Sequence, residues 1–153
     1  MKKSFSVYNC HCYAPLIFTH QGASWIPTMD PDFRLPVTAT YGEMAPASLK
    51  MLGERTTLFE RWSPKARLSP AYFEAFFASA AKAAEAQGVP LYCGEYGVID
   101  RVPPELALAW YRAIHEAFEA YGFGRAAWSY RQMDFGLSDP RMDSVRPELI
   151  RCL

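Results

Sequence analysis

Hydrophobic positions recur along this chain with two different periods. Over residues 70–84, apolar side chains return every three or four positions, which predicts a helix with one buried face. Ser69-Pro70 suits the start of this helix and Gly88 its end. A second helix with the same periodicity opens at Pro103-Pro104 and ends before Gly122. Both helices have enough aromatic and aliphatic residues to cover a sheet.

Three shorter segments are predicted as strands: residues 5–13, 90–95 and 125–130. Between the first strand and the first long helix lies a proline-rich stretch, residues 15–68, with one short helix expected around 47–59. A connection of this length is uncommon in a compact domain and usually carries function.

The predicted order is strand, long loop, helix, strand, helix, strand and a last short helix around residues 147–152, with Ser144 as its expected cap. Strands that alternate with helices imply parallel pairing and an α/β fold. A chain of 153 residues is ordinarily one domain, so residues 1–153 are treated as a single unit.

Composition excludes several function classes. Sixteen basic residues balance sixteen acidic ones and no basic patch stands out, so neither nucleic acid nor membrane is expected as a partner. No apolar run reaches the length of a membrane span, and no signal peptide is visible. The spacing of the four cysteines fits no common zinc pattern, so no metal is expected, and no cofactor is expected either. The cysteines are expected as core residues: Cys10, Cys12, Cys93 and Cys152.

Chemically versatile side chains fall at the predicted strand ends. Glu95 follows an apolar run and a glycine, and a carboxylate at the tip of a buried strand is costly without partners. His11, Tyr13 and Trp128 lie at or near the carboxyl ends of the other two strands. Active sites of parallel sheets gather at these ends.

These residue types suit glycoside hydrolysis. A glutamate can act as nucleophile or general base, Tyr13 can donate a hydrogen bond to it, and His11 can bond to the substrate or to the carboxylate. Trp128 offers an apolar platform for a sugar ring. Each residue alone has an ordinary explanation: a loop ion pair for Glu95, and packing for the others. Their joint placement favours the functional interpretation.

The sequence also resembles glycoside hydrolase family 5, the cellulase family. The run from Tyr8 to Trp25, YNCHCYAPLIFTHQGASW, resembles the segment at the family's sixth strand. Gly94-Glu95-Tyr96-Gly97 resembles its seventh strand, and residues 126–130 with Phe135-Gly136 resemble its eighth. The resemblance implies an α/β fold that is a partial TIM (β/α)8 barrel, with about three β/α units of the C-terminal half, and a retaining glycosidase chemistry on β-linked glucans.

The resemblance assigns a role to each matching residue. Glu95 would be the nucleophile, Tyr13 would hydrogen-bond it, His11 would order the site, and Trp128 would stack on the sugar before the cleaved bond. The expected partner is a polysaccharide or oligosaccharide. The family suggests a secreted or periplasmic protein, although this chain contains no signal peptide. The loop after the first strand supplies further candidates for substrate binding: His20, Gln21 and Trp25.

The sequence departs from the family pattern in one important respect. Retaining hydrolysis uses two carboxyl groups about 5–5.5 Å apart, and the family places the acid/base in an Asn-Glu pair that occurs nowhere in this chain. No other glutamate is an obvious substitute. The chain is then a portion of a longer barrel, a partial barrel completed by self-association through exposed strand edges, or a remnant that binds carbohydrate without cutting it. A plain α/β scaffold would leave the clustered strand-end residues unexplained.

Overall fold

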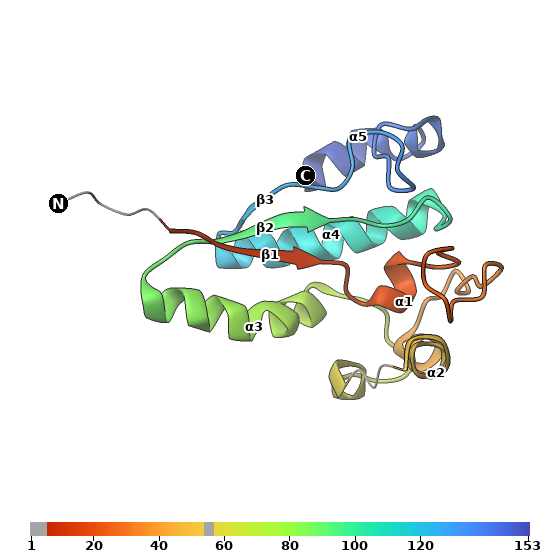
Figure 1. The fold of residues 1–153 in the computed structure, drawn as a ribbon, viewed down its shortest axis with the longest axis horizontal. Coiled ribbons are helices and arrows are strands. Elements are labelled where there is room, and N and C mark those ends of the chain that lie inside the picture. The colour runs from red at the N-terminus through yellow and green to blue at the C-terminus, as the bar shows by residue number, and fades with distance from the viewer. Residues whose placement is uncertain (1–5, 54–56) are drawn as a thin grey trace.

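A computed structural model describes residues 6–53 and 57–153, and its elements alternate as expected for an α/β chain (Figure 1). The strands are β1 (Tyr8–Cys12), β2 (Leu91–Tyr96) and β3 (Gly124–Arg125). The two long helices are α3 (Pro70–Gln87) and α4 (Pro104–Tyr121). Shorter helices are α1 (Leu16–Thr19), α2 (Tyr41–Leu52) and α5 (Arg146–Leu149), with 3-10 turns at Thr57–Arg61, Pro140–Met142 and Ile150–Cys152.

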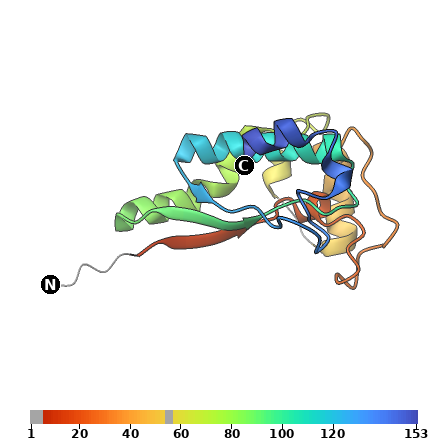
Figure 2. The same cartoon turned by 90° about the horizontal axis from the view of Figure 1, so that it is seen from above.

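The three strands form one parallel sheet in the order β1-β2-β3, which confirms the predicted parallel α/β arrangement. Figure 2 shows the long helices on one side of this sheet. At the end of β1 the exposure differs accordingly: His11 is exposed, whereas Cys12 is buried beneath the helices. Parallel sheets are normally covered on both faces. The open face of this sheet corresponds to the inside of a barrel.

The strand predictions hold with shorter boundaries. Phe5 lies outside the described residues, and β1 begins at Tyr8. The third strand was predicted over 125–130, but its regular pairing is limited to β3. Its backbone nevertheless continues beside β2, because the Ala126 amide donates to the Cys93 carbonyl at 2.9 Å.

The helix predicted around residues 47–59 was placed wrongly. Helix α2 begins six residues earlier and ends at Gly53, which adopts a left-handed conformation. Its start is fixed by Glu43, whose carboxylate accepts the Thr40 amide proton at 2.8 Å, in the manner of a capping box. The Thr40-x-x-Glu43 spacing signalled this start, and Pro46 lies inside the helix rather than before it.

Ser144 is not a helix cap. Val145 occupies the N-cap position of α5, and no side chain caps this helix by a hydrogen bond. The two long helices, by contrast, end as predicted, at Gly88 and Gly122, both in the left-handed conformation.

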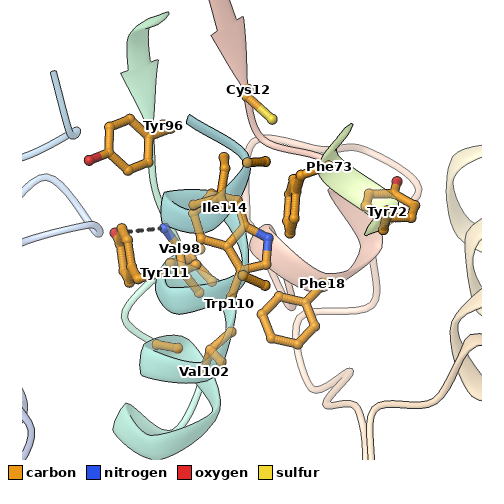
Figure 3. Close-up of a cluster of buried hydrophobic side chains, with 14 of the residues drawn as sticks. Cys12, Phe18, Tyr72, Phe73, Tyr96, Val98, Val102, Trp110, Tyr111 and Ile114 are labelled. Atoms are coloured by element: carbon orange, nitrogen blue, oxygen red, sulfur yellow. Dashed lines mark hydrogen bonds between the residues drawn. The ribbon is translucent and has the colours of Figure 1, made fainter. Parts of the chain in front are cut away.

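Trp110 of α4 connects the core to the carboxyl end of the sheet. Its ring is 1% exposed and packs edge-to-face on Phe73 of α3, with ring centroids 5.5 Å apart (Figure 3). Its indole N–H donates to the carbonyl of Ala14 at 3.0 Å, just beyond β1. One buried side chain thereby fixes the helix layer to the turn that follows β1.

The cysteines belong to the core, as predicted. All four are free, with Cys12, Cys93 and Cys152 buried and Cys10 partly buried. Burial raises the pKa of Cys12 to about 12, so its thiol stays protonated at neutral pH.

Replacement of Trp110 by alanine should cost about 3–5 kcal/mol of unfolding free energy, because it opens a large cavity and leaves the Ala14 carbonyl without its donor. Val37→Ala is the control, since Val37 is 74% exposed and should change stability by less than about 0.5 kcal/mol. Urea unfolding measures both. Equal losses in the two variants would contradict the central place of Trp110.

Candidate active site

The Glu95 carboxylate at the end of β2 has two polar neighbours. The Tyr13 hydroxyl donates to Glu95 Oε2 at 3.1 Å, which is the hydrogen bond expected from the sequence. The imidazole Nδ1 of His11 lies 3.4 Å from the same oxygen. The Glu95 side chain is 34% exposed and that of His11 48%. The carboxylate is thus partnered on one side and open to a ligand on the other.

An irregularity in the pairing of β1 and β2 brings these groups together. Cys10 pairs with Cys93, but the next residue, His11, pairs with Glu95, so β2 carries one additional residue, Gly94. Without this bulge, the alternation of side chains would place Glu95 opposite Cys12, whose side chain is buried under the helices. The bulge therefore puts Glu95 on the open face of the sheet beside His11.

Asn9 holds the bulge, and the sequence analysis missed it. Its side-chain oxygen accepts the Gly94 amide proton at 3.0 Å. A Cβ atom on Gly94 would lie 2.5 Å from that oxygen, so a larger residue there would displace the Asn9 side chain. Asparagine is rare inside strands, but nothing near Asn9 in the sequence indicates its bond to Gly94, which lies 85 residues further along the chain.

Tyr13 is a neutral hydrogen-bond donor. Burial, and then the hydrogen bond to Glu95, raise the pKa of its phenol well above the usual range. A phenol that keeps its proton can orient an ionised carboxylate without adding negative charge beside it.

Trp128 lies beside the end of β2. Its amide donates to the Tyr96 carbonyl at 2.9 Å, and its side chain is partly buried. A Cβ atom on Gly97 would stand 2.2 Å from the Trp128 carbonyl oxygen. The second glycine of the Gly94-Glu95-Tyr96-Gly97 segment is therefore needed for the close approach of these two chain segments.

An aromatic cluster adjoins the carboxylate. The Phe135 ring lies 5.7 Å from that of Tyr13 and 6.3 Å from that of Trp25, and the His20 ring contacts all three. Trp25 is 48% exposed, so it can offer a ring face to a ligand. The sequence did not predict the contact between Phe135 and Tyr13.

The structure places His20 and Gln21 inside the loop rather than on its surface. His20 is 9% exposed, and burial lowers its pKa to about 4, so the ring is neutral at ordinary pH. Gln21 is fully buried, with its amide nitrogen on the Phe18 carbonyl at 3.1 Å and its oxygen on the Leu35 amide at 2.7 Å. Both side chains support the loop, and their contact with a substrate stays a prediction.

The described residues provide neither a second carboxylate partner for Glu95 nor a metal site. Among the hydrogen bonds and ion pairs recorded for residues 6–53 and 57–153, the Glu95 carboxylate meets only the hydroxyl of Tyr13 and the imidazole of His11. Within the same ranges, no group of three or more His, Cys, Asp or Glu side chains could hold a metal ion. No helix in that part of the chain is long and apolar enough to cross a bilayer.

Comparison with curated proteins identifies relatives. The chain is 40% identical over 119 residues to cellodextrinase A of Ruminococcus flavefaciens, a match that covers 78% of this chain. This match agrees with the resemblance to the C-terminal part of glycoside hydrolase family 5 enzymes. Endoglucanase C of Acetivibrio thermocellus is 29% identical over 149 residues, or 97% of this chain. No protein-family model matches the sequence. The chain spans 28% of the cellodextrinase and 43% of the endoglucanase.

Solved structures of this glycoside hydrolase family show the same partial fold. Thermotoga maritima Cel5A in complex with mannotriose superimposes with a TM-score of 0.64 at 22% identity, over 99% of this chain and 40% of that enzyme. A hyperthermophilic endo-beta-1,4-glucanase gives a TM-score of 0.60 over 88% of this chain. At these identities the likeness concerns the fold alone. The three-stranded unit thus corresponds to part of a (β/α)8 barrel.

Gly97→Ala should lower the unfolding free energy by about 1–3 kcal/mol, because the new methyl group forces the Trp128 backbone away from β2. The control is Gly122→Ala, which strains a left-handed residue (φ 66°) far from any side-chain contact. Fluorine NMR of 5-fluorotryptophan protein should show the Trp128 resonance moving only in Gly97→Ala. An unmoved resonance would contradict the close-approach argument.

The buried His20 should make stability fall on acidification. Its folded pKa of about 4 lies below the ordinary 6.5, so the unfolded chain takes up a proton that the folded chain excludes. The contribution of His20 to the free energy of unfolding is fully present above pH 6.5, and about 3 kcal/mol of it is lost by pH 4. In His20→Phe this component should be absent when denaturant unfolding is followed from pH 7 to 4. Identical pH slopes for the variant and wild type would refute the assignment.

Proposed function

We propose that this chain provides the nucleophile side of a retaining glycosidase that acts on β-linked glucans, with Glu95 as the nucleophile. The observation that carries the proposal is the Glu95 carboxylate with its two partners, Tyr13 and His11, on the open face of the sheet. Cellodextrinase and endoglucanase relatives support the reaction class.

The proposed reaction follows from the geometry of Glu95. The carboxylate oxygen attacks the anomeric carbon, a carbon–oxygen bond forms, and the glycosidic bond breaks as the leaving oxygen takes a proton from a general acid. Water then hydrolyses the glycosyl-enzyme. The Tyr13 hydroxyl would keep the attacking carboxylate oriented, and His11 would bind a sugar hydroxyl or the carboxylate.

The reaction needs a second carboxyl group about 5–5.5 Å from Glu95. None is among the recorded partners of Glu95 in the described ranges, so another part of a longer protein, or a second copy of this chain, would supply it. β1 and β3 form the two edges of the described sheet, and unpaired edges are suited to such an association.

Two tryptophans are the proposed sugar-binding surface. Trp128 lies beside the end of β2, and Trp25 exposes half of its ring next to Phe135. Aromatic rings of this kind stack on the C–H face of a pyranose. Since solved Cel5A complexes contain cellobiose or mannotriose, a β-linked oligosaccharide of glucose or mannose is the proposed ligand.

A second candidate function is carbohydrate binding without cleavage. It is favoured by the missing second carboxylate partner, because binding needs only the aromatic platform. Retention on insoluble cellulose that is lost in Trp128→Ala, together with no turnover of any substrate, would support this candidate over the first.

The test uses 2,4-dinitrophenyl β-cellobioside, whose leaving group departs without a proton and so does not depend on the missing acid. We expect the chain to release dinitrophenolate, and Glu95→Gln to lose at least about a thousandfold of the rate. The control is Glu105→Gln, which removes an exposed carboxylate in the first turn of α4. A Glu95→Gln rate near wild type would refute the nucleophile assignment.

A further inference from the structure

Residues 19–21, in the loop after β1, contact the segments that follow all three strands of the sheet. Thr19, the last residue of α1, and His20 and Gln21, which follow it, are all buried although they are polar. Buried polar side chains are stable only when hydrogen-bonded. Their partners show which segments they join.

Thr19 joins the end of β1 to the segment after β2. Its hydroxyl donates to the Tyr13 carbonyl at 2.6 Å, and its own carbonyl accepts the Ile99 amide proton at 2.9 Å. The backbone of Tyr13 is therefore held by a side chain whose own position is fixed from the β2 side.

His20 fills the space between Tyr13 and the segment after β3. Its Nδ1 lies 3.0 Å from the Thr19 hydroxyl oxygen. Since the single hydroxyl proton of Thr19 goes to the Tyr13 carbonyl, this oxygen accepts from Nδ1–H, and His20 is held as one neutral tautomer. The ring lies edge-on to Tyr13 at 5.3 Å and contacts Phe135 at 5.4 Å.

Gln21 extends the same arrangement to the long loop through its bonds to the Phe18 carbonyl and the Leu35 amide. These bonds lie away from Tyr13, so they anchor the loop without touching the side chain that contacts Glu95. The contacts to Tyr13 come from Thr19, through its backbone, and from His20, through its ring.

We infer that Thr19 and His20 are positioning residues that hold the Tyr13 hydroxyl on Glu95. Thr19 fixes the Tyr13 backbone and His20 fixes its ring, while Phe135 closes the other side. The consequence for catalysis rests on the proposed role of Glu95, but the placement of Tyr13 does not. The alternative is that both residues merely stabilise the loop.

The experiment follows the Tyr13 side chain directly by NMR of the whole chain labelled with 13Cζ-tyrosine. Tyr13→Phe assigns its resonance. The Tyr13 signal should differ between the unsubstituted chain and Glu95→Gln, because the substitution removes the carboxylate that accepts the Tyr13 hydroxyl proton. The size of this shift difference, the Glu95-dependent amplitude, is the readout for the positioning of Tyr13.

In Thr19→Val, which keeps the side-chain shape but removes the hydroxyl, this amplitude is the shift difference between Thr19→Val and Thr19→Val with Glu95→Gln. It should be less than half of the amplitude in the chain that keeps Thr19. Thr19→Ser should restore it. The Tyr111 resonance is the internal control, because Tyr111 is buried in the core and donates no bond to these residues; it should stay unmoved if the fold is intact.

An undiminished amplitude in folded Thr19→Val would overturn the inference. If Thr19→Val does not fold, His20→Leu takes its place: it removes both Nδ1 and the ring that lies edge-on to Tyr13, and an undiminished amplitude there would overturn the inference equally. Turnover is not needed for either result. A chain that releases no dinitrophenolate from 2,4-dinitrophenyl β-cellobioside, but whose amplitude falls in Thr19→Val, would count against the proposed function and support the positioning role.

Discussion

The bulge at Gly94 is the constraint on which the candidate site depends. Side chains alternate strictly along a strand, so an acidic residue one position out of register would point into the helix layer. The inserted Gly94, held by Asn9, turns Glu95 to the open face opposite His11. A carboxylate is tolerated there because it stays partly exposed to solvent and has a hydroxyl and an imidazole as polar neighbours, whereas full burial would remove its hydrogen bonds to water.

The rest of the chain stabilises this arrangement from beneath and beside it. Trp110 binds the helix layer to the turn after β1, and Gly97 lets the Trp128 segment approach the end of β2. The loop after β1 then folds back so that Thr19 meets the Tyr13 carbonyl. Core packing, two glycines and one buried loop thus all stabilise the carboxyl end of the sheet.

Periodicity predicted the parallel sheet and both long helices because these elements have uniform local signals. It failed at α2, where a cap outweighed an internal proline, Pro46. The strand-end residues Glu95, Tyr13 and His11 could be selected from position and chemistry alone. Asn9 and the burial of Gln21 could not, because their roles come from hydrogen bonds to Gly94 and Leu35, residues distant in sequence. Such contacts leave no periodic trace.

The most direct measurement of the central claim is covalent trapping. A 2-deoxy-2-fluoro-β-cellobioside with a dinitrophenyl leaving group forms a glycosyl-enzyme that is slow to hydrolyse, and peptide mass spectrometry locates it. The account predicts one fluorocellobiosyl group attached to Glu95. A group on another carboxylate, or dinitrophenolate release with no adduct on Glu95, would contradict the assignment of Glu95 as nucleophile.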